Sequence, residues 1–297
     1  MKQRVFITGA LGFTAQYVAA EFELQGHEVW GCCQQASADN ARYVQCDLLD
    51  TQGLAAAIQS AKPNVVIHLA ALAFVGHGSP AEFYAVNVAG TRSLLEAITL
   101  SGVAVDHVIL ASSANVYGNS AGGRLSESTP ANPENDYAVS KFAMEKMAYL
   151  WRESFPITVT RPFNYTGIGQ SERFLVPKIA RHYIDRAPEI ELGNLDVSRD
   201  FSDVRDVAQI YRRIAERPSG FRVLNICSGT TLSLRQVLEM AADITGHDML
   251  VSVNPAFVRA NEVKTLCGDT TLLESCIGPV SRKGFRQTLS WMLAETL

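Results

Sequence analysis

The segment Thr8-Gly9-Ala10-Leu11-Gly12-Phe13-Thr14-Ala15 decides the fold of this chain. It follows a short apolar run of strand length and precedes a helical pattern that ends at Gly26. Gly9 allows a tight turn, Gly12 lets the backbone approach a pyrophosphate at the helix N-terminus, and the small Ala15 permits close packing of helix on sheet. The segment therefore predicts a dinucleotide-binding turn, and a purely structural turn between strand and helix is the alternative.

Apolar runs of strand length alternate with helical patterns through the first half of the chain. Strands are expected over residues 5–8, 29–31, 65–69, 105–111 and 157–160, and helices over 13–24, 54–58, 86–100 and 137–153. Asp50 or Thr51 is the expected N-cap of the second helix. Strands that are apolar on both faces and separated by helices predict a parallel sheet with helices on each side.

The second half is less regular. We expect a helix near residues 203–216, a strand at 222–227, and a helix that begins with the capping box formed by Ser233 and Gln236. Together the patterns predict an α/β fold, a Rossmann-like doubly wound parallel sheet with a smaller, discontinuous α/β substrate-binding lobe. The expected dinucleotide-binding domain comprises residues 1–163, 198–227 and 281–297, and the expected lobe comprises 164–197 and 228–280.

Composition excludes several classes of protein. The 26 Lys and Arg residues against 30 Asp and Glu give a net charge of −4 without long charged runs, so neither a nucleic-acid stripe nor a polybasic membrane patch is expected. No apolar stretch approaches ~18 residues, the length that spans a bilayer. The six cysteines lack CxxC spacing and nearby histidines, which predicts reduced thiols in a cytoplasmic protein without a metal site.

The end of the second strand bears on cofactor choice. An NAD site of this type usually has an acidic residue there, which binds the ribose 2′-hydroxyl. Here the chain reads Gly31-Cys32-Cys33-Gln34-Gln35, with neither a carboxylate nor an arginine. The uncharged end favours NADPH, and NADH is the alternative.

A phenol and an ammonium group lie four residues apart in Tyr137-Ala138-Val139-Ser140-Lys141. That spacing places both on one face of a helix, where Lys141 stabilises the phenolate and lowers the pKa of Tyr137. Tyr137 then becomes a proton donor or acceptor near neutral pH. The stretch Ser112-Ser113-Ala114-Asn115-Val116-Tyr117-Gly118, which follows a strand, favours this catalytic interpretation over a surface pair on a helix.

Nearly the whole chain resembles the extended short-chain dehydrogenase/reductase family. The matching segments are TGALGF at 8–13, CDL at 46–48, HLAA at 68–71, NVAGT at 87–91, SSANVYG at 112–118, YAVSK at 137–141 and RPFN at 161–164. The resemblance implies that Ser113, rather than Ser112, donates a hydrogen bond to the substrate oxygen. It also implies a homodimer that pairs the helices at 86–100 and 137–153.

The same resemblance implies a set of cofactor-binding residues. Asp47 would bind the adenine amine, Ala70 and Ala71 would line the cofactor, and Lys141 would hold the nicotinamide ribose. The full implied set is Gly9, Leu11, Gly12, Phe13, Asp47, Leu48, Leu69, Ala70, Ala71, Tyr137, Lys141 and Pro162.

The second half is similar to the members of this family that act on GDP-sugars, through the segments 161–180, 193–207, 225–229 and 259–263. This similarity implies that the substrate contacts Ser113, Asn164, Lys178, Arg199, Arg259 and Glu262. Arginine forks and a lysine suit a diphosphate, and a carboxylate suits the donors of a guanine or ribose edge. The alternative is that Arg199 and Asp200 form a surface ion pair and that Lys178 is a solvated helix residue.

Within that branch, the resemblance separates two chemistries. A 4,6-dehydratase has a carboxylic acid within two positions of the catalytic hydroxyl, where this chain has Ala114 and Asn115. A 4-ketoreductase needs only Ser113, Tyr137 and Lys141. We therefore expect NAD(P)H-dependent reduction of the C4 ketone of a GDP-4-keto-6-deoxy-hexose to GDP-6-deoxy-D-mannose (GDP-rhamnose) or its C4 epimer. The alternatives are a nucleotide-sugar 4-epimerase with tightly bound NAD, the 4,6-dehydratase, and a non-catalytic dinucleotide sensor.

Overall fold

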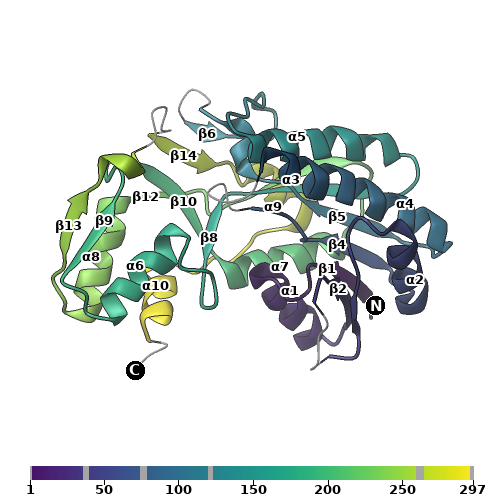
Figure 1. Cartoon of the computed structure of the whole chain (residues 1–297), viewed down its shortest axis with the longest axis horizontal. Coiled ribbons are helices and arrows are strands. Elements are labelled where there is room, and N and C mark those ends of the chain that lie inside the picture. Colours follow the sequence, from purple (N-terminus) through teal and green to yellow (C-terminus); the bar gives the residue numbers. More distant parts are fainter. Residues whose placement is uncertain (1, 36–39, 74–78, 120–122, 259–263, 295–297) are drawn as a thin grey trace.

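The computed structural model describes residues 2–35, 40–73, 79–119, 123–258 and 264–294. Figure 1 shows a larger part built on a parallel sheet and, beside it, a smaller lobe of helices and short strands that carries the C-terminal helix.

The larger part is organised by a seven-stranded sheet in the order β11-β7-β5-β4-β1-β2-β3, and every neighbouring pair is parallel. The strands are β1 Arg4–Thr8, β2 Glu28–Cys33, β3 Tyr43–Gln45, β4 Val65–His68, β5 His107–Ala111, β7 Ile157–Pro162 and β11 Arg222–Ile226. The strand order reverses between β1 and β4, and the carboxyl ends of the strands at such a point are where open α/β sheets bind ligands.

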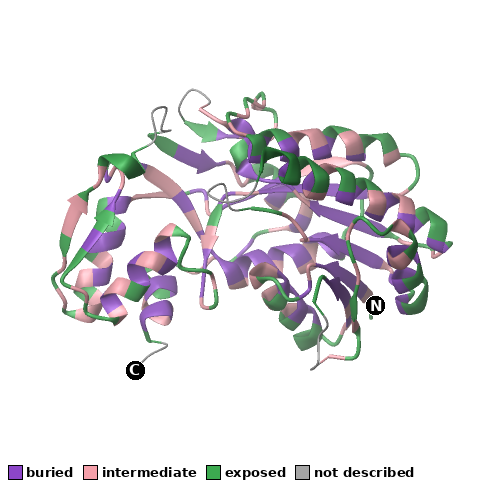
Figure 2. Ribbon diagram, viewed as in Figure 1, coloured by how far each residue is buried: buried purple, intermediate pink, exposed green. Residues whose placement is uncertain are grey.

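Helices cover both faces of this sheet (Figure 1). One face packs against α1 Phe13–Leu24, α7 Val204–Ala215 and α9 Thr271–Ile277, and the other against α2 Thr51–Ala61, α4 Thr91–Ser101 and α5 Asp136–Ala148. In β1, Val5 and Ile7 enter the first core while Phe6 enters the second. Figure 2 shows the strands buried between exposed outer helix faces. The predicted doubly wound α/β sheet is therefore confirmed.

The lobe has its own apolar core, formed by three helices and a two-stranded parallel sheet. Its elements are α6 Leu175–Ile184, α8 Leu234–Thr245, α10 Phe285–Leu293, β9 Glu189–Leu192 and β13 Leu250–Val253. Short strands join it to the larger part in the order β12-β10-β14-β6, with β8 on β10. They are β6 Arg124–Leu125, β8 Asn164–Thr166, β10 Ser198–Asp203, β12 Thr231–Ser233 and β14 Thr265–Gly268.

Local signals in the sequence place the starts of two helices correctly. Asp50 caps α2 by accepting a hydrogen bond from the Gly53 backbone at 2.9 Å. Ser233 and Gln236 form the predicted capping box at the start of α8. Those ends were predictable because the capping side chains lie next to the backbone groups that they satisfy.

The predicted helix over residues 86–100 is wrong in form. Helix α3 Pro80–Tyr84 comes first, then the π-helical segment Ala85–Gly90, and only then α4. Within the segment, Asn87 is fully buried, and a Cβ at Gly90 would stand 2.5 Å from the Leu48 side chain. The wider turn thus accommodates tertiary contacts that helical periodicity does not reveal.

Packing also differs from the expected division of the chain. Strand β10 and helix α10 were assigned to the dinucleotide-binding domain, but among the described strands β10 pairs with the short strands alone, and α10 packs in the core of the lobe. Conversely, α9 was assigned to the lobe, and its Leu273 and Ile277 lie in a core of the large sheet. The chain therefore passes between the large sheet and the lobe at other places than the sequence motifs predict.

Candidate active site

The turn after β1 has the geometry of a phosphate cradle. Gly9 has a φ of +69°, and a Cβ there would stand 2.9 Å from Ala70 Cα. The Gly12 backbone N–H donates to the Gly9 carbonyl at 2.8 Å, and no side chain caps the first turn of α1. The bare backbone therefore leaves room and free N–H groups for an anion, which fits a dinucleotide pyrophosphate.

A buried hydrogen-bond chain supports the neighbouring strand end. His68 Nδ1 lies 2.6 Å from Thr8 Oγ1, and His68 Nε2 lies 2.9 Å from Thr91 Oγ1. Thr91 donates in turn to the Asn87 carbonyl at 2.7 Å. Burial first, and the Lys141 charge second, lower the pKa of His68 to about 3, so its imidazole is neutral. The chain holds the end of β4 against β1, where half-buried Leu69, Ala70 and Ala71 follow.

Asn87 connects this segment to the helix that carries Tyr137 and Lys141, the predicted catalytic pair. Its Oδ1 accepts from the Leu72 backbone at 3.0 Å, while its Nδ2 donates to the Leu72 carbonyl at 3.2 Å and to Ser140 Oγ at 3.0 Å. All three contacts cross between distant parts of the sequence. Asn87 and His68 belong to the quoted motifs, but spacing alone gave them no role.

Ser113, Tyr137 and Lys141 come together at the carboxyl end of β5. Their exposed fractions are 9%, 7% and 3%. Ser113 Oγ accepts from the Asn115 backbone at 3.1 Å, and the Ser113 side chain hydrogen-bonds with Tyr137. Lys141 Nζ donates to the Ala111 carbonyl at 2.8 Å. The structure thus assembles the three predicted catalytic side chains from β5 and α5.

The pKa of Tyr137 differs from the expectation. Burial raises it to about 12, with the Ser113 hydrogen bond opposing, instead of Lys141 lowering it. Burial likewise lowers the pKa of Lys141 to about 8, against the opposing charge of Glu145. Both shifts follow from the cost of charge in a dry environment. The phenol is therefore protonated at neutral pH and is ready to act as a proton donor.

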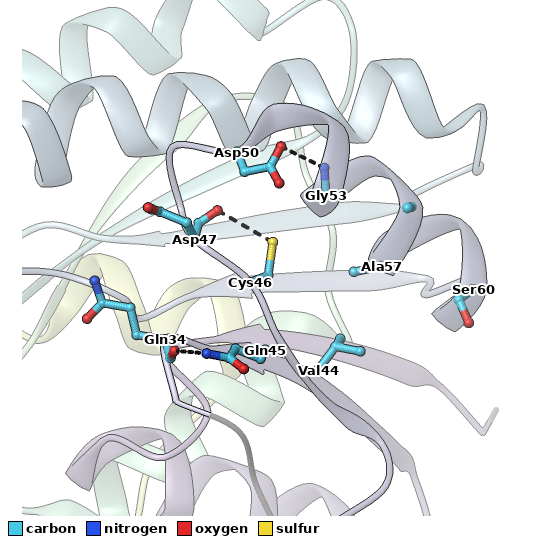
Figure 3. Close-up of a pocket in the computed structure, with 10 residues that line it drawn as sticks. Gln34, Val44, Gln45, Cys46, Asp47, Asp50, Gly53, Ala57 and Ser60 are labelled. Atoms are coloured by element: carbon cyan, nitrogen blue, oxygen red, sulfur yellow. Dashed lines mark hydrogen bonds between the residues drawn. The ribbon is translucent and has the colours of Figure 1, made fainter.

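The adenine end of the proposed cofactor site lies outside this centre. Asp47 is exposed after β3, and its Oδ1 accepts from the Leu49 backbone at 2.9 Å. Figure 3 shows the adjoining pocket of about 590 Å³, lined by Gln34, Val44, Gln45, Cys46, Asp47, Asp50, Gly53, Ala56, Ala57 and Ser60. Gln34, at the end of β2, is exposed there, and its carbonyl accepts from Gln45 Nε2 at 3.0 Å. The β2 end thus presents amides rather than a carboxylate.

The remaining cofactor candidates border the turn or the sheet edge. Leu11 is exposed and Phe13 is half-buried, with its ring parallel to that of Tyr165 at 6.3 Å between centroids. Leu48 packs against Gly90, and Pro162 ends β7 half-buried. Leu11 and Leu48 lie in the turns after β1 and β3, Phe13 begins α1 and Pro162 ends β7, so all four lie at or after the carboxyl ends of strands of the sheet.

The substrate candidates lie on the short strands and the lobe. Asn164 is exposed on β8, next to Phe201 of β10, two residues beyond the half-buried Arg199. Lys178 Nζ donates to the Glu191 carbonyl at 2.9 Å and lies over the Phe257 ring. Arg259 and Glu262 lie outside the described residues.

The suggested surface pair of Arg199 with Asp200 is wrong, because Asp200 is fully buried. Its carboxylate accepts from the Ser228 backbone and hydroxyl, both at 2.7 Å, from Gly229 N at 2.9 Å and from Gly268 N at 3.2 Å. Asp200 thus joins β10 to the segment that follows β11 and to β14. A buried carboxylate with this many donors is a structural anchor.

The chain belongs to the GDP-mannose 4,6 dehydratase family of extended short-chain dehydrogenases/reductases, whose family model matches residues 6–292. GDP-6-deoxy-D-talose 4-dehydrogenase from Aggregatibacter actinomycetemcomitans is 34% identical, over 93% of this chain and 91% of that protein. GDP-6-deoxy-D-mannose reductase from Pseudomonas aeruginosa is 32% identical, over 99% and 97% respectively. Membership of this family confirms the resemblance drawn from the motifs.

Solved structures agree with the fold. A Burkholderia cenocepacia J2315 protein, provisionally assigned as an epimerase, is 44% identical with a TM-score of 0.92, over 98% of this chain and 97% of that one. The structure named RMD from Pseudomonas aeruginosa, in complex with NADPH, is 30% identical with a TM-score of 0.87, over 99% and 97%.

The described residues contain neither a membrane-spanning helix nor a metal-ligand cluster. None of their helices is long and apolar enough to cross a membrane. No group of three or more His, Cys, Asp or Glu side chains among them could hold a metal ion.

Proposed function

We propose that this protein is an NAD(P)H-dependent reductase that converts the C4 ketone of a GDP-4-keto-6-deoxy-hexose to an alcohol. The observation that carries the proposal is the buried cluster of Ser113, Tyr137 and Lys141, at the same carboxyl edge of the sheet as the Gly9 turn. The two curated relatives support the substrate class, since both names specify a GDP-6-deoxy-hexose and a redox reaction. NADPH is the proposed cofactor, supported by the uncharged end of β2 and by the NADPH complex of the structural relative.

When bound, the reduced nicotinamide supplies a hydride to C4 of the sugar. Tyr137 delivers its phenolic proton to the developing C4 alkoxide, which the protonated state of the buried phenol permits at neutral pH. Ser113 Oγ accepts from the Asn115 backbone and the side chain hydrogen-bonds with Tyr137, which places its hydroxyl next to the phenol, where it can donate to the same oxygen. Lys141 uses one proton on the Ala111 carbonyl and keeps two for Tyr137 and a ribose hydroxyl.

Dehydration is disfavoured by the residues next to Ser113. Expulsion of the C6 hydroxyl requires a proton-transferring side chain beside the catalytic hydroxyl. Ala114 is buried with no ionisable group, and Asn115 is an amide that cannot transfer a proton. Simple ketone reduction makes no such demand.

For the nucleotide, we propose contacts from Asn164, Lys178 and Arg199, with Arg259 and Glu262 completing the set. Arg199 offers a planar fork and Lys178 a point charge for a diphosphate. Lys178 Nζ lies over the Phe257 ring and gives one proton to the Glu191 carbonyl, which leaves two protons for phosphate oxygens. A division that follows the two cores would assign β10 and α10 to this substrate lobe and α9 to the cofactor domain.

The direct test is the oxidation of NADPH, followed at 340 nm, upon addition of GDP-4-keto-6-deoxy-mannose. We expect one NADPH consumed per sugar, and proton NMR of the product then assigns C4. Large H3–H4 coupling identifies the manno product and small coupling the talo epimer. No consumption with either NADPH or NADH would refute the proposal.

A nucleotide-sugar 4-epimerase is the second candidate, favoured by the 44% identical structure assigned provisionally to that activity. The same three side chains serve an epimerase, but its NAD stays bound and is regenerated in each turnover. Purified protein would then carry NAD and would interconvert a sugar nucleotide without net change at 340 nm.

We also propose a cytoplasmic homodimer. All six cysteines are free thiols, and burial raises the pKa of Cys32 to about 12, so that thiol is unreactive. Exposed Leu100 of α4 and Val139 of α5 support pairing through these packed helices. Sedimentation velocity of the wild type and of Val139→Glu tests this assembly. We expect the wild type to sediment as a dimer and the variant as a monomer.

A further inference from the structure

A carboxylate and a guanidinium are buried together beneath the catalytic cluster. Arg161 of β7 donates to Glu145 of α5 through Nε at 2.9 Å and through Nη2 at 2.6 Å. Their side chains are only 7% and 4% exposed, respectively. Burying such a pair removes two charges from water, which is expensive unless other hydrogen bonds compensate. Neither residue transfers a proton or binds a ligand in the reaction proposed above.

Ser112 supplies the additional hydrogen bond. Its hydroxyl donates to Glu145 Oε1 at 2.6 Å, and Ser112 is itself buried. The preceding residue, Ala111, accepts from Lys141 Nζ at 2.8 Å, and the following residue is the catalytic Ser113. Two hydrogen bonds therefore connect α5 to consecutive residues at the end of β5, one from Lys141 and one to Glu145.

Helix geometry explains why these contacts act on one place. Tyr137, Lys141 and Glu145 are spaced by four residues, so all three lie on the same face of α5. Arg161 holds Glu145 from β7, the strand next to β5 in the sheet. Its guanidinium also lies 4.9 Å from the Tyr117 ring centre, above that ring. The carboxylate is thus fixed from two strands while it faces the lysine one turn away.

The charges around Lys141 have opposite effects. Burial lowers its pKa to about 8, and the Glu145 carboxylate raises it. Among the described residues, Tyr137 lies one turn before Lys141 on the same helix, His68 of β4 is neutral, and the Arg161 cation is bonded to the Glu145 carboxylate. Glu145 is therefore the anion that favours the ammonium form of Lys141.

We propose that Glu145, held by Arg161, is a positioning residue that keeps Lys141 charged and the Ser112–Ser113 segment in register with Tyr137. This inference rests on the proposed reductase function. Ser112 then has a role distinct from that of Ser113. The hydrogen bond from Ser112 to Glu145 fixes the end of β5 relative to α5, whereas Ser113 faces the substrate.

The test compares the pH dependence of kcat in matched variants. Glu145→Gln alone leaves Arg161 buried and unpaired, so the main variant is the double change Glu145→Gln with Arg161→Met, which removes both charges. We expect the loss of kcat on the alkaline side to move at least one pH unit lower than in the wild type. The control Glu21→Gln breaks the ion pair with Arg212 that joins α1 to α7. It should leave the alkaline limb of the kcat profile, where kcat falls with rising pH, at its wild-type position.

Ser112→Ala keeps the ion pair and isolates the register contact. It should lower kcat about tenfold, with KM and the alkaline limb unchanged. An alkaline limb that stays at the wild-type pH in the double variant would overturn the electrostatic role, and wild-type kcat in Ser112→Ala would overturn the register role.

A second readout separates this inference from the proposed function. The Lys141 ¹³Cε resonance in lysine-labelled protein, assigned by its loss in Lys141→Met, gives the pKa of Lys141 without turnover. The pKa of Lys141 should fall by at least one unit in the double variant. If the double variant does not fold, the same fall is expected in Glu145→Gln. An unchanged value overturns the inference, whereas a wild-type protein inactive on the GDP-4-keto sugar overturns only the proposed reaction.

Discussion

Gly9 and Ala70 approach so closely that a methyl group on Gly9 would stand 2.9 Å from Ala70 Cα and 3.0 Å from Ala70 N. The contact joins the turn after β1 to the segment after β4, at the position where the strand order reverses. The proposed crevice for the cofactor therefore depends on the absence of one side chain.

Gly9→Ala should cost about 1–2 kcal/mol for the left-handed backbone and about 1–3 kcal/mol for overpacking. Its NADPH affinity, measured by fluorescence titration, should fall more than tenfold. Gly26→Ala is the matched control, because Gly26 has a φ of +79° with nothing within 4 Å of the added Cβ. The control should show only the backbone cost and unchanged affinity; equal affinity in both variants would contradict the cradle.

Tyr137→Phe should lower kcat about 10²–10⁴-fold, because the variant has no proton for the C4 oxygen. The ring keeps its edge-to-face contact with Phe83, so circular dichroism and the thermal midpoint should stay close to wild type. Wild-type turnover in a folded Tyr137→Phe protein would refute the assignment of this phenol.

Lys141→Met should abolish turnover and stabilise the fold at pH 7 by about 1–3 kcal/mol. Burial lowers the pKa of Lys141 from 10.5 to about 8, so folding disfavours the charged form. The unfolded chain binds the extra proton between pH 8 and 10.5, and wild-type stability therefore gains from this group as pH rises through that window. Urea unfolding at pH 7 to 10 should show the gap between variant and wild type shrinking; a gap that widens would be inconsistent with a buried ammonium.

The hydroxyls of Thr14 and Tyr165 lie 2.8 Å apart and connect the first turn of α1 to β8. A double-mutant cycle with Thr14→Val and Tyr165→Phe should give a coupling of about 0.5–1.5 kcal/mol in unfolding free energy. Thr14→Ser retains the hydroxyl and serves as the control. Additive effects of the two changes would show that the contact contributes nothing.

Much of the fold was predictable because its signals are local. The Gly9–Ala15 turn, the buried strands and the caps at Asp50 and Ser233 each depend on residues close in sequence. The short strands β6, β8, β12 and β14 were not predicted. Each is two to four residues long and exists only because a distant strand lies beside it.

The part of the candidate site that depends on local spacing or on motifs was also predictable. Tyr137 and Lys141 are joined by helical spacing, and the motifs supplied Ser113. Glu145 lies at the same spacing, four residues after Lys141, and that spacing was the signal that could have identified it. Its partner Arg161 lies 16 residues further along the chain, on strand β7, so no local pattern pairs the two residues.

By itself, the sequence determined the α/β class, the glycine turn proposed to bind the dinucleotide and the residues of the proposed catalytic cluster, because periodicity and spacing encode contacts within a helix or turn. Tertiary structure decided that Tyr137 has a raised rather than a lowered pKa, and that Asp200 is an anchor rather than a surface ion. It also decided that α9 packs on the large sheet and α10 in the lobe, the reverse of the expected division. Burial is the common reason, since desolvation and packing depend on groups that meet only when the chain is folded.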